Sequence, residues 1–425
     1  MTTIDTVVIG AGHAGLAVSR LLTATGRDHV VLDRGSIAER WRSERWDSLH
    51  LLTPNWMTRL PGWRYHGPDQ ESYMSAGDLV GYLEEYAASF DAPVQEGTTV
   101  EDVSQGADGY VVTTDRGAWH ARHVVIATGP WGTPHVPAGV GSLGPDVEIL
   151  SASRYRSPEA LAPGAVLVVG ASSSGVQIAD ELARSGRQVT LSVGRHTRMP
   201  RRYRGMDVFW WLERTGRLGR TIEEVRDPAE ARREPSMQLV GRPEPARREE
   251  DLSLALLKER GVELAGRLVE GGGSRIRFAG DLAERASEAD RRMHRFLDVV
   301  DHHVESTGLS AEVWRPDRPR PWEPAPGPST LDVHDRGITT VVLATGYRPH
   351  HPWLRLPVTT PDGAIRQRRG VTPAPGVYVV GQRFQHRRDS GFIDGARHDA
   401  AAVVRHLTAA AQPAAVPSEP SARWS

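Results

Sequence analysis

The sequence predicts an α/β fold made of two similar units, and two observations carry this prediction. Near the N-terminus, a short apolar strand at residues 4–9 runs directly into the glycine turn 10–15 (GAGHAG), which opens a helical segment. The same order returns at residues 166–169 and 170–175 (GASSSG), again followed by a helical segment. A strand, a glycine turn and a helix in this order open a dinucleotide-binding unit of the Rossmann type, so two such domains are predicted.

The helix and strands of each unit follow the pattern that this fold needs. In the first helix the apolar positions recur at the spacing of one buried face: Ala14, Ala17, Val18, Leu21 and Leu22. A β-rich run follows each helix, at residues 29–33 in the first unit and 188–193 in the second. Each unit is therefore expected to place its glycine turn at the end of a central parallel strand.

The glycines of the first turn have separate roles. Gly10 permits the tight turn, Gly12 lets the backbone approach a pyrophosphate, and Gly15 lets the helix pack against the strand. The start of the helix adds free N–H groups and a partial positive charge. These residues are predicted to bind the phosphates of a dinucleotide.

The second turn keeps the two outer glycines, Gly170 and Gly175, and has Ser172 in place of the middle one. The phosphate is therefore expected to sit slightly farther out or to accept a hydrogen bond from the serine hydroxyl. Ser174 belongs to the same predicted site.

The two units differ at the end of their second strand, the position that determines which cofactor binds. Asp33 ends the second strand of the first unit, where a carboxylate can accept both ribose hydroxyls, and Arg34 beside it is included in the predicted site. The corresponding strand of the second unit is followed by Arg195, with Arg198 and Arg201 nearby. An arginine can pair with a 2′-phosphate that a carboxylate would repel. We therefore assign FAD to the first unit and NADPH to the second, with a solvated surface arginine as the alternative interpretation of Arg195.

Two further apolar strands end in Ala-Thr-Gly, where the chain is expected to pass between the units. One ends at Thr128 and Gly129, the other at Thr345 and Gly346. The predicted organisation is an FAD domain from residues 1–155 and 340–410, an inserted NADPH domain at 156–339, and a disordered tail at 411–425. A small hairpin at residues 110–122 is expected inside the FAD domain.

A last buried strand closes on Gly381, and a helix is expected from residue 393 to about 407. Ser390 is the predicted N-cap of this helix. If the helix start faces the flavin ring, its dipole would stabilise negative charge on the reduced flavin. A surface helix is the alternative.

The composition excludes several kinds of chemistry and partner. The chain has no cysteine and a single lysine, Lys258, so disulfide exchange, a thiolate nucleophile and a Schiff base are not expected. The net charge of −1 argues against nucleic acid and anionic membranes as partners. No apolar run has membrane-spanning length, and a cytoplasmic protein is expected. His294, His302 and His303 share a predicted helix at 281–307 with arginines, so no metal site is predicted.

Residues 4–410 resemble the flavin-containing monooxygenases (class B flavoprotein monooxygenases), nearest the YUCCA-type plant indole-3-pyruvate monooxygenases and bacterial FMO-like flavoproteins. The resemblance rests on both glycine turns, both Ala-Thr-Gly strands and the segments 41–51 and 54–61. It implies that Trp41 or Trp46 lies near the flavin ring and that Asn55 lies near its reactive edge. A simple turn residue is the alternative for Asn55.

The resemblance also implies an activity. The expected enzyme is an NADPH-dependent, FAD-containing monooxygenase that forms a flavin 4a-hydroperoxide. It would insert one atom of molecular oxygen into a small organic substrate, by N-, S- or α-keto-acid oxidation. The family fingerprint at residues 145–155 keeps only Tyr155, because Val147 and Ser151 replace its glycine and histidine. An NAD(P)H:acceptor oxidoreductase that reduces a quinone or another small acceptor therefore stays open, as does a nucleotide-binding regulator. Whether the protein forms a homodimer is a separate question that the sequence leaves open.

Three segments have a structural and a functional interpretation. The charged residues 226–251 are expected to form a solvated loop, or a lid over the NADPH cleft. The aromatic run 209–212 is expected to be a buried helix rather than a pocket wall. The proline-rich residues 315–329 should be an extended connector.

Overall fold

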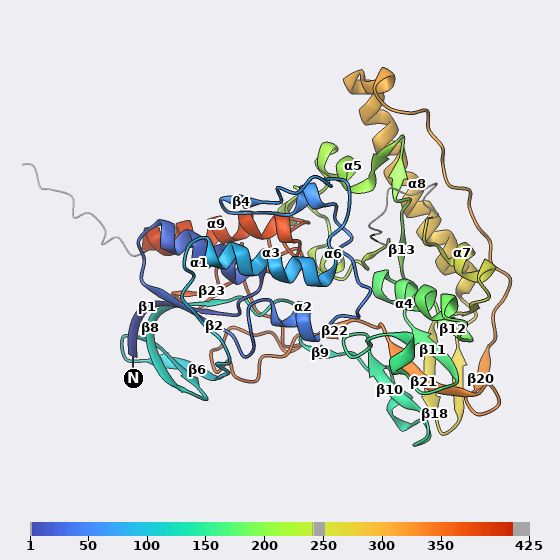
Figure 1. Ribbon diagram of the computed structural model, residues 1–425, viewed down its shortest axis with the longest axis horizontal. Coiled ribbons are helices and arrows are strands. Elements are labelled where there is room, and N and C mark those ends of the chain that lie inside the picture. Colours follow the sequence, from blue (N-terminus) through green and yellow to red (C-terminus); the bar gives the residue numbers. More distant parts are fainter. Residues whose placement is uncertain (1, 240, 242–250, 411–425) are drawn as a thin grey trace, which may run out of the picture.

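The computed structural model describes residues 2–239, 241 and 251–410, and the predicted tail lies outside them. Two largely parallel sheets form two lobes, which lie side by side in Figure 1. The strand order is β5-β2-β1-β8-β7-β6 in the first sheet, where β23 also pairs with β8, and β10-β21-β11-β12-β17 in the second. The predicted α/β fold with two Rossmann-type units is confirmed.

The first lobe packs helices against a sheet whose strands come from both ends of the chain. Its main elements are β1 (Thr2–Ile9), α1 (His13–Ala24), β2 (His29–Leu32), α2 (Glu39–Ser43), β3 (Arg59–Leu60), β4 (Trp63–Arg64), α3 (Ala76–Ala88), β5 (Val94–Gln95), β6 (Val100–Gly106), β7 (Gly109–Thr114), β8 (Gly117–Ile126), β23 (Val377–Val379) and α9 (Ile393–Ala410). β1 lies between β2 and β8 and is parallel to both. The expected hairpin is present as β7 and β8, but β8 continues without a break into the central sheet.

The second lobe repeats the strand–turn–helix–strand unit. It contains β10 (Glu148–Ser151), β11 (Ala165–Val169), α4 (Ser173–Arg184), β12 (Val189–Ser192), α7 (Leu254–Glu259), β17 (Glu263–Ala265) and β21 (Ile338–Leu343), with an antiparallel sheet of β18 (Leu268–Gly272), β19 (Arg275–Phe278) and β20 (Thr330–Asp332). Val341 of β21 lies opposite Leu167 on one side and Ile149 on the other. The second sheet therefore begins before residue 156 and extends beyond 339. The predicted boundaries shift because β10 and β21 find their partners in this sheet.

Two connectors join the lobes. β9 (Thr133–Pro134) follows the first Ala-Thr-Gly strand and pairs antiparallel with β22 (Tyr347–Arg348), which follows the second. The remaining elements are β13 (Thr197–Arg198), β14 (Arg202–Tyr203), β15 (Met206–Asp207), α5 (Val208–Arg214), α6 (Pro228–Arg232), β16 (Met237–Gln238), α8 (Leu282–Thr307) and the short 3₁₀ turns η1 (Asn55–Met57), η2 (Val140–Ser142), η3 (Pro158–Ala160), η4 (Ile222–Glu224) and η5 (Leu309–Ala311). Residues 315–328 have no regular structure, as expected of a connector.

A buried contact fastens the second lobe to the first. Phe209 and Trp211 of α5 share one apolar cluster with Met57 of the first lobe, so the aromatic run is buried as predicted. Beside it, the guanidinium of Arg201 pairs with Asp207. The hydroxyl of Tyr73, from the first lobe, donates to the same carboxylate at 2.9 Å. The cluster thus combines apolar burial with an enclosed, hydrogen-bonded ion pair.

Backbone contacts that only glycine allows hold each helix against its strand. A Cβ on Gly15 would lie 1.9 Å from the carbonyl oxygen of Gly10, and a Cβ on Gly175 would lie 1.8 Å from that of Gly170. A Cβ on Gly12 would meet nothing within 4 Å. The third glycine of each motif is therefore required by packing, whereas the middle one is not.

Replacing Gly175 by alanine should destabilise the protein by about 1–3 kcal/mol or more, because backbone must move to admit the methyl group. Urea unfolding measures this loss. The matched control is Gly81→Ala in α3, where a Cβ would meet nothing within 4 Å. There, helix propensity predicts a gain of up to about 1 kcal/mol. Equal effects of the two substitutions would contradict the packing role of Gly175.

Candidate functional site

The first glycine turn leaves the start of α1 open. Gly12 has φ −80° and ψ 179°, no side chain caps the helix, and its first turn has no acidic residue. Asp33 lies beside the turn, where its carboxylate accepts hydrogen bonds from the N–H of Ala11 at 2.7 Å and of Gly35 at 3.0 Å. The free N–H groups of the helix and the carboxylate therefore lie together, in the arrangement predicted for a phosphate and a ribose.

Buried polar atoms without partners surround this turn. Beside the turn, Nε2 of His13 and Oγ1 of Thr128 are buried and find no hydrogen-bond partner among the described residues. The chain also approaches closely here, since a Cβ on Gly381 would lie 3.0 Å from Cβ of Ala14. Gly129 lies at the same edge, where its carbonyl accepts from Gln382 Nε2 at 3.2 Å. The residues present fit a dinucleotide cofactor such as FAD, which can use these groups.

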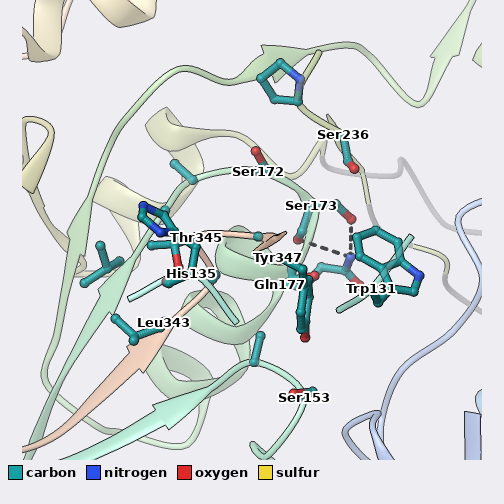
Figure 2. Close-up of a pocket in the computed structure, with 18 of the residues that line it drawn as sticks. Trp131, His135, Ser153, Ser172, Ser173, Gln177, Ser236, Leu343, Thr345 and Tyr347 are labelled. Atoms are coloured by element: carbon teal, nitrogen blue, oxygen red, sulfur yellow. Dashed lines mark hydrogen bonds between the residues drawn. The ribbon is translucent and has the colours of Figure 1, made fainter. Parts of the chain in front are cut away.

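The second turn has almost the same geometry. Ser172 has φ −80° and ψ −173°, and no side chain caps α4. This serine is compatible with the turn because its φ is negative and because the equivalent Gly12 has open space at Cβ. The adjacent Ser173 accepts from Gln177 Nε2 through its carbonyl oxygen at 3.2 Å and its hydroxyl at 3.0 Å (Figure 2).

A cavity of about 670 Å³ opens at this second turn and is lined from both lobes. The predicted site residues in its lining are Trp41, Trp46, Gly170, Ser172, Ser174, Arg195, Thr345 and Gly346. Figure 2 shows Trp131 and Tyr347, from the two connectors, around the same cavity. Their rings pack edge to face at 5.4 Å, and sequence reasoning missed both because no motif marks them. The second turn, the tryptophans and the connectors therefore share one space, whereas the first turn is not part of its lining.

The cavity is rich in positive charge. Arg45, Arg195, Arg233, Arg267 and Arg383 line it, while Glu44 is the one carboxylate among the described lining residues. Burial lowers the pKa of Arg45 and of Arg383, although both stay charged at neutral pH. Such a lining favours a ligand with several negative charges.

The three arginines predicted near the second cofactor have different surroundings. Arg195 lines the cavity and pairs with Glu230 of α6. Arg198 instead pairs with Asp290, and Arg201 is buried against Asp207. Neither of the latter two lines the cavity, so Arg195 is the one of the three that faces a ligand bound there.

Arg267, which sequence reasoning missed, lines the cavity beside Arg195. It follows β17, and the pairing of β17 with β12 brings it to the end of the second strand. No local sequence motif predicts that Arg267 lies at the cavity. The only available signal was a basic residue directly after an apolar strand.

Asn55 does not line the cavity, and the structure favours its alternative interpretation as a turn residue. Its Nδ2 donates to the carbonyl of Asp69 at 2.9 Å, and its Oδ1 accepts from the N–H of Met74 at 2.9 Å. Both polar ends are therefore used in holding the loop that precedes α3. Leu51 and Leu52, slightly earlier in the chain, line the cavity instead.

One further prediction needs correction. Ser390 does not cap α9, which begins at Ile393, because its Oγ accepts from the N–H groups of His386 and Arg387 at 3.2 and 2.9 Å. Arg34, next to Asp33, is exposed and pairs with Glu44 at 2.6 Å, and its place in the FAD site stays a prediction.

Tyr155, the one residue left of the family fingerprint at residues 145–155, has a packing and hydrogen-bonding role in this chain. Tyr155 is fully buried, and its hydroxyl donates to Glu181 at 2.8 Å. Burial and the neighbouring carboxylate raise the pKa of Tyr155 well above its usual range. Neither this tyrosine nor Ser151 lines the cavity, whereas Ser153 does.

Two other features of the described residues are a group of possible metal ligands and the apolar character of the helices. Asp389, Asp394 and His398 lie close enough to hold a metal ion, but Arg387 and Arg59 neutralise the two carboxylates. None of the described helices combines the length and the apolar character that crossing a membrane requires.

The structure thus combines two Rossmann-type units with a cavity that both lobes line, the architecture predicted from the sequence. Residues 7–212 match the family model described as pyridine nucleotide-disulphide oxidoreductase. An uncharacterized CzcO-like oxidoreductase of Geobacillus kaustophilus is 29% identical over 415 residues, which are 95% of this chain and 98% of that protein. Indole-3-pyruvate monooxygenase YUCCA1 of Oryza sativa is 34% identical over 209 residues, which are 48% of this chain and 51% of that protein.

Solved structures show the same architecture. A flavin-containing monooxygenase from Stenotrophomonas maltophilia superposes with a TM-score of 0.66 at 21% identity, over 97% of this chain and all of that one. A bacillithiol disulfide reductase from Bacillus cereus shares the fold at a TM-score of 0.61 and 15% identity. The resemblance predicted from sequence is confirmed: the chain is similar to oxidoreductases over nearly its whole length and to indole-3-pyruvate monooxygenases over about half of it.

A buried carboxylate next to the Ser390 loop gives a pH-dependent stability. Asp399 is fully buried, and burial raises its pKa to about 6, from an ordinary value near 4 in the unfolded chain. Folding favours the protonated form of Asp399. Its contribution to the free energy of unfolding is therefore present at low pH and is lost as the pH rises through 6. Asp399→Asn should therefore stabilise the protein at pH 8, by about 1–3 kcal/mol. At pH 4 the gain should be small.

Urea unfolding of the FAD-loaded protein at pH 4 and pH 8 measures the difference. The control is Asp28→Asn, which removes an exposed carboxylate. If the substitution at Asp399 destabilises the protein equally at both pH values, burial does not raise the pKa of this carboxyl group.

Proposed function

We propose that the protein is an NADPH-dependent, FAD-containing monooxygenase. It would transfer one atom of molecular oxygen to a small organic substrate by oxidising nitrogen, sulfur or an α-keto acid. The observation that carries this proposal is a single cavity lined by both lobes, with an uncapped, glycine-rich helix start in each lobe. The monooxygenases among its relatives support oxygen as the electron acceptor, and the chain has no cysteine for a disulfide route.

In this proposal the first lobe holds FAD. Gly10, Gly12 and Gly15 form the phosphate turn, Asp33 accepts the ribose hydroxyls, and Thr128 supplies an unpartnered hydroxyl. Bound FAD supplies the two-electron redox chemistry and the activation of oxygen. The protein contributes binding, orientation and the electrostatic environment.

The second lobe holds NADPH. Its pyrophosphate would bind at the start of α4, beside Ser172 and Ser174. Arg195 and Arg267 line the cavity at the strand ends, where the 2′-phosphate of the adenosine ribose belongs in this fold. The positive lining of the cavity supports a ligand with this charge.

Aromatic and aliphatic side chains form the rest of the wall. Trp41, Trp46 and Trp131 line the cavity together with Leu51 and Leu52. An apolar wall excludes water, which protects a reactive oxygenating species from unproductive decay. The second candidate, an oxidoreductase that reduces a quinone or a similar acceptor, is favoured by the placement of Tyr155 and Ser151 outside the cavity.

Arg195→Gln should weaken NADPH about tenfold to a hundredfold, because a charge-assisted hydrogen bond to the 2′-phosphate is lost. NADH should be affected little. Rates of flavin reduction at varied coenzyme concentration, under anaerobic conditions, give both affinities. Arg184→Gln, an exposed arginine on α4, is the control. A wild-type preference for NADH would contradict the assignment of Arg195.

Turnover under ¹⁸O₂ with amines, thioethers and α-keto acids should incorporate a single labelled atom into at least one class of product. Mass spectrometry of the product and an assay for hydrogen peroxide check this. Recovery of all consumed oxygen as peroxide, with rapid reduction of a quinone, would favour the acceptor oxidoreductase instead.

A further inference from the structure

Residues 227–238, hereafter the strap, form part of the cavity wall. The strap contains α6 and β16, and its Arg233, Pro235 and Ser236 line the cavity. Figure 2 shows Ser236 around the same space as Ser172 and Ser173 of the second glycine turn. These residues belong to the charged segment 226–251, for which the sequence left a solvated loop and a lid open, and residues 240 and 242–250 lie outside the described structure.

The strap is fastened to both lobes. The carbonyl of Glu234 accepts from Arg383, and its carboxylate pairs with Arg388 at 3.0 Å, both on the first lobe. On the second lobe, Nε2 of the buried Gln238 donates to the carbonyl of Ala171, inside the glycine turn, at 2.7 Å. The strap therefore has a defined position relative to the cofactor turn.

A third attachment uses the arginine assigned to the coenzyme. Arg195 pairs with Glu230, with the two side chains 36% and 52% exposed. The carboxylate is well placed for this pair, because Asp227 caps α6 through the N–H of Glu230 at 3.0 Å. In the structure, the guanidinium of Arg195 is therefore engaged by an anion of the protein itself.

A 2′-phosphate would have to share this guanidinium with the carboxylate or displace it, and the two anions repel each other. A second arginine of the cavity lining, Arg267, is partly offset by Asp281, 3.8 Å away. A dinucleotide without the 2′-phosphate can bind and leave the ion pair undisturbed. The cost of disturbing it is thus confined to the phosphorylated coenzyme.

We infer that Glu230 is a specificity-determining residue that competes with the 2′-phosphate for Arg195. By weakening NADPH selectively, it sets how strongly the protein prefers NADPH to NADH. This inference rests on the proposed function in one respect, the assignment of the second turn to the nicotinamide coenzyme.

Binding of 2′,5′-ADP and of 5′-AMP to the FAD-loaded protein tests it, because the probes differ by the 2′-phosphate and neither is oxidised. Isothermal titration calorimetry should show Glu230→Gln binding 2′,5′-ADP about two- to fivefold more tightly, as expected for release of an exposed ion pair. The affinity for 5′-AMP should not change. Glu223→Gln is the matched control, since Glu223 also pairs with an arginine, Arg369, which unlike Arg195 does not line the cavity.

The same substitution in an Arg195→Gln background separates competition from a general charge effect. The gain should vanish there, because the cation for which the two anions compete is absent. No gain in the single variant, an equal gain for 5′-AMP, or an undiminished gain without Arg195 would each overturn the inference. Failure of oxygen incorporation would contradict only the proposed function, since both probes report binding alone.

Discussion

The close backbone contact inside each glycine turn is the constraint on which the rest of the site depends. Gly10 and Gly170 have φ values of 110° and 106°, and the third glycine of each turn presses against the carbonyl of the first. This contact sets the helix start directly at the end of the central strand. Because no side chain caps either helix, the N–H groups stay free for phosphate. One local geometry, used twice, thereby creates both candidate cofactor sites.

The second constraint is the contact that fixes the lobes relative to each other. The buried pair of Arg201 and Asp207, joined by Tyr73, lies beside a shared apolar cluster, and breaking such a pair leaves an uncompensated buried charge. The strap adds polar contacts from the second lobe to Arg383 and Arg388. The residues that form the cavity walls therefore have defined partners, among them the ion pair of Arg195 with Glu230.

The chain has no cysteine, which limits the routes by which electrons can leave it. A bacillithiol disulfide reductase superposes about as well as a flavin-containing monooxygenase, so the fold alone does not decide where electrons go. With no thiol in the chain, electrons that reach the flavin must leave for an acceptor other than a protein disulfide of its own. We propose that the aromatic cavity wall, rather than the sheet topology, determines the acceptor and the substrate.

The sequence by itself determined the two units, the glycine roles and the place of Asp33, because each follows from local spacing along one strand and one helix. Only the tertiary structure decided which distant side chains meet. β17 brings Arg267 to the cavity, β10 and β21 move the domain boundaries, and Asn55 is used by its own loop. Arg198 and Arg201, near the motif in sequence, are instead held by Asp290 and Asp207. Charge partners are chosen by proximity in space, which spacing along the chain does not encode.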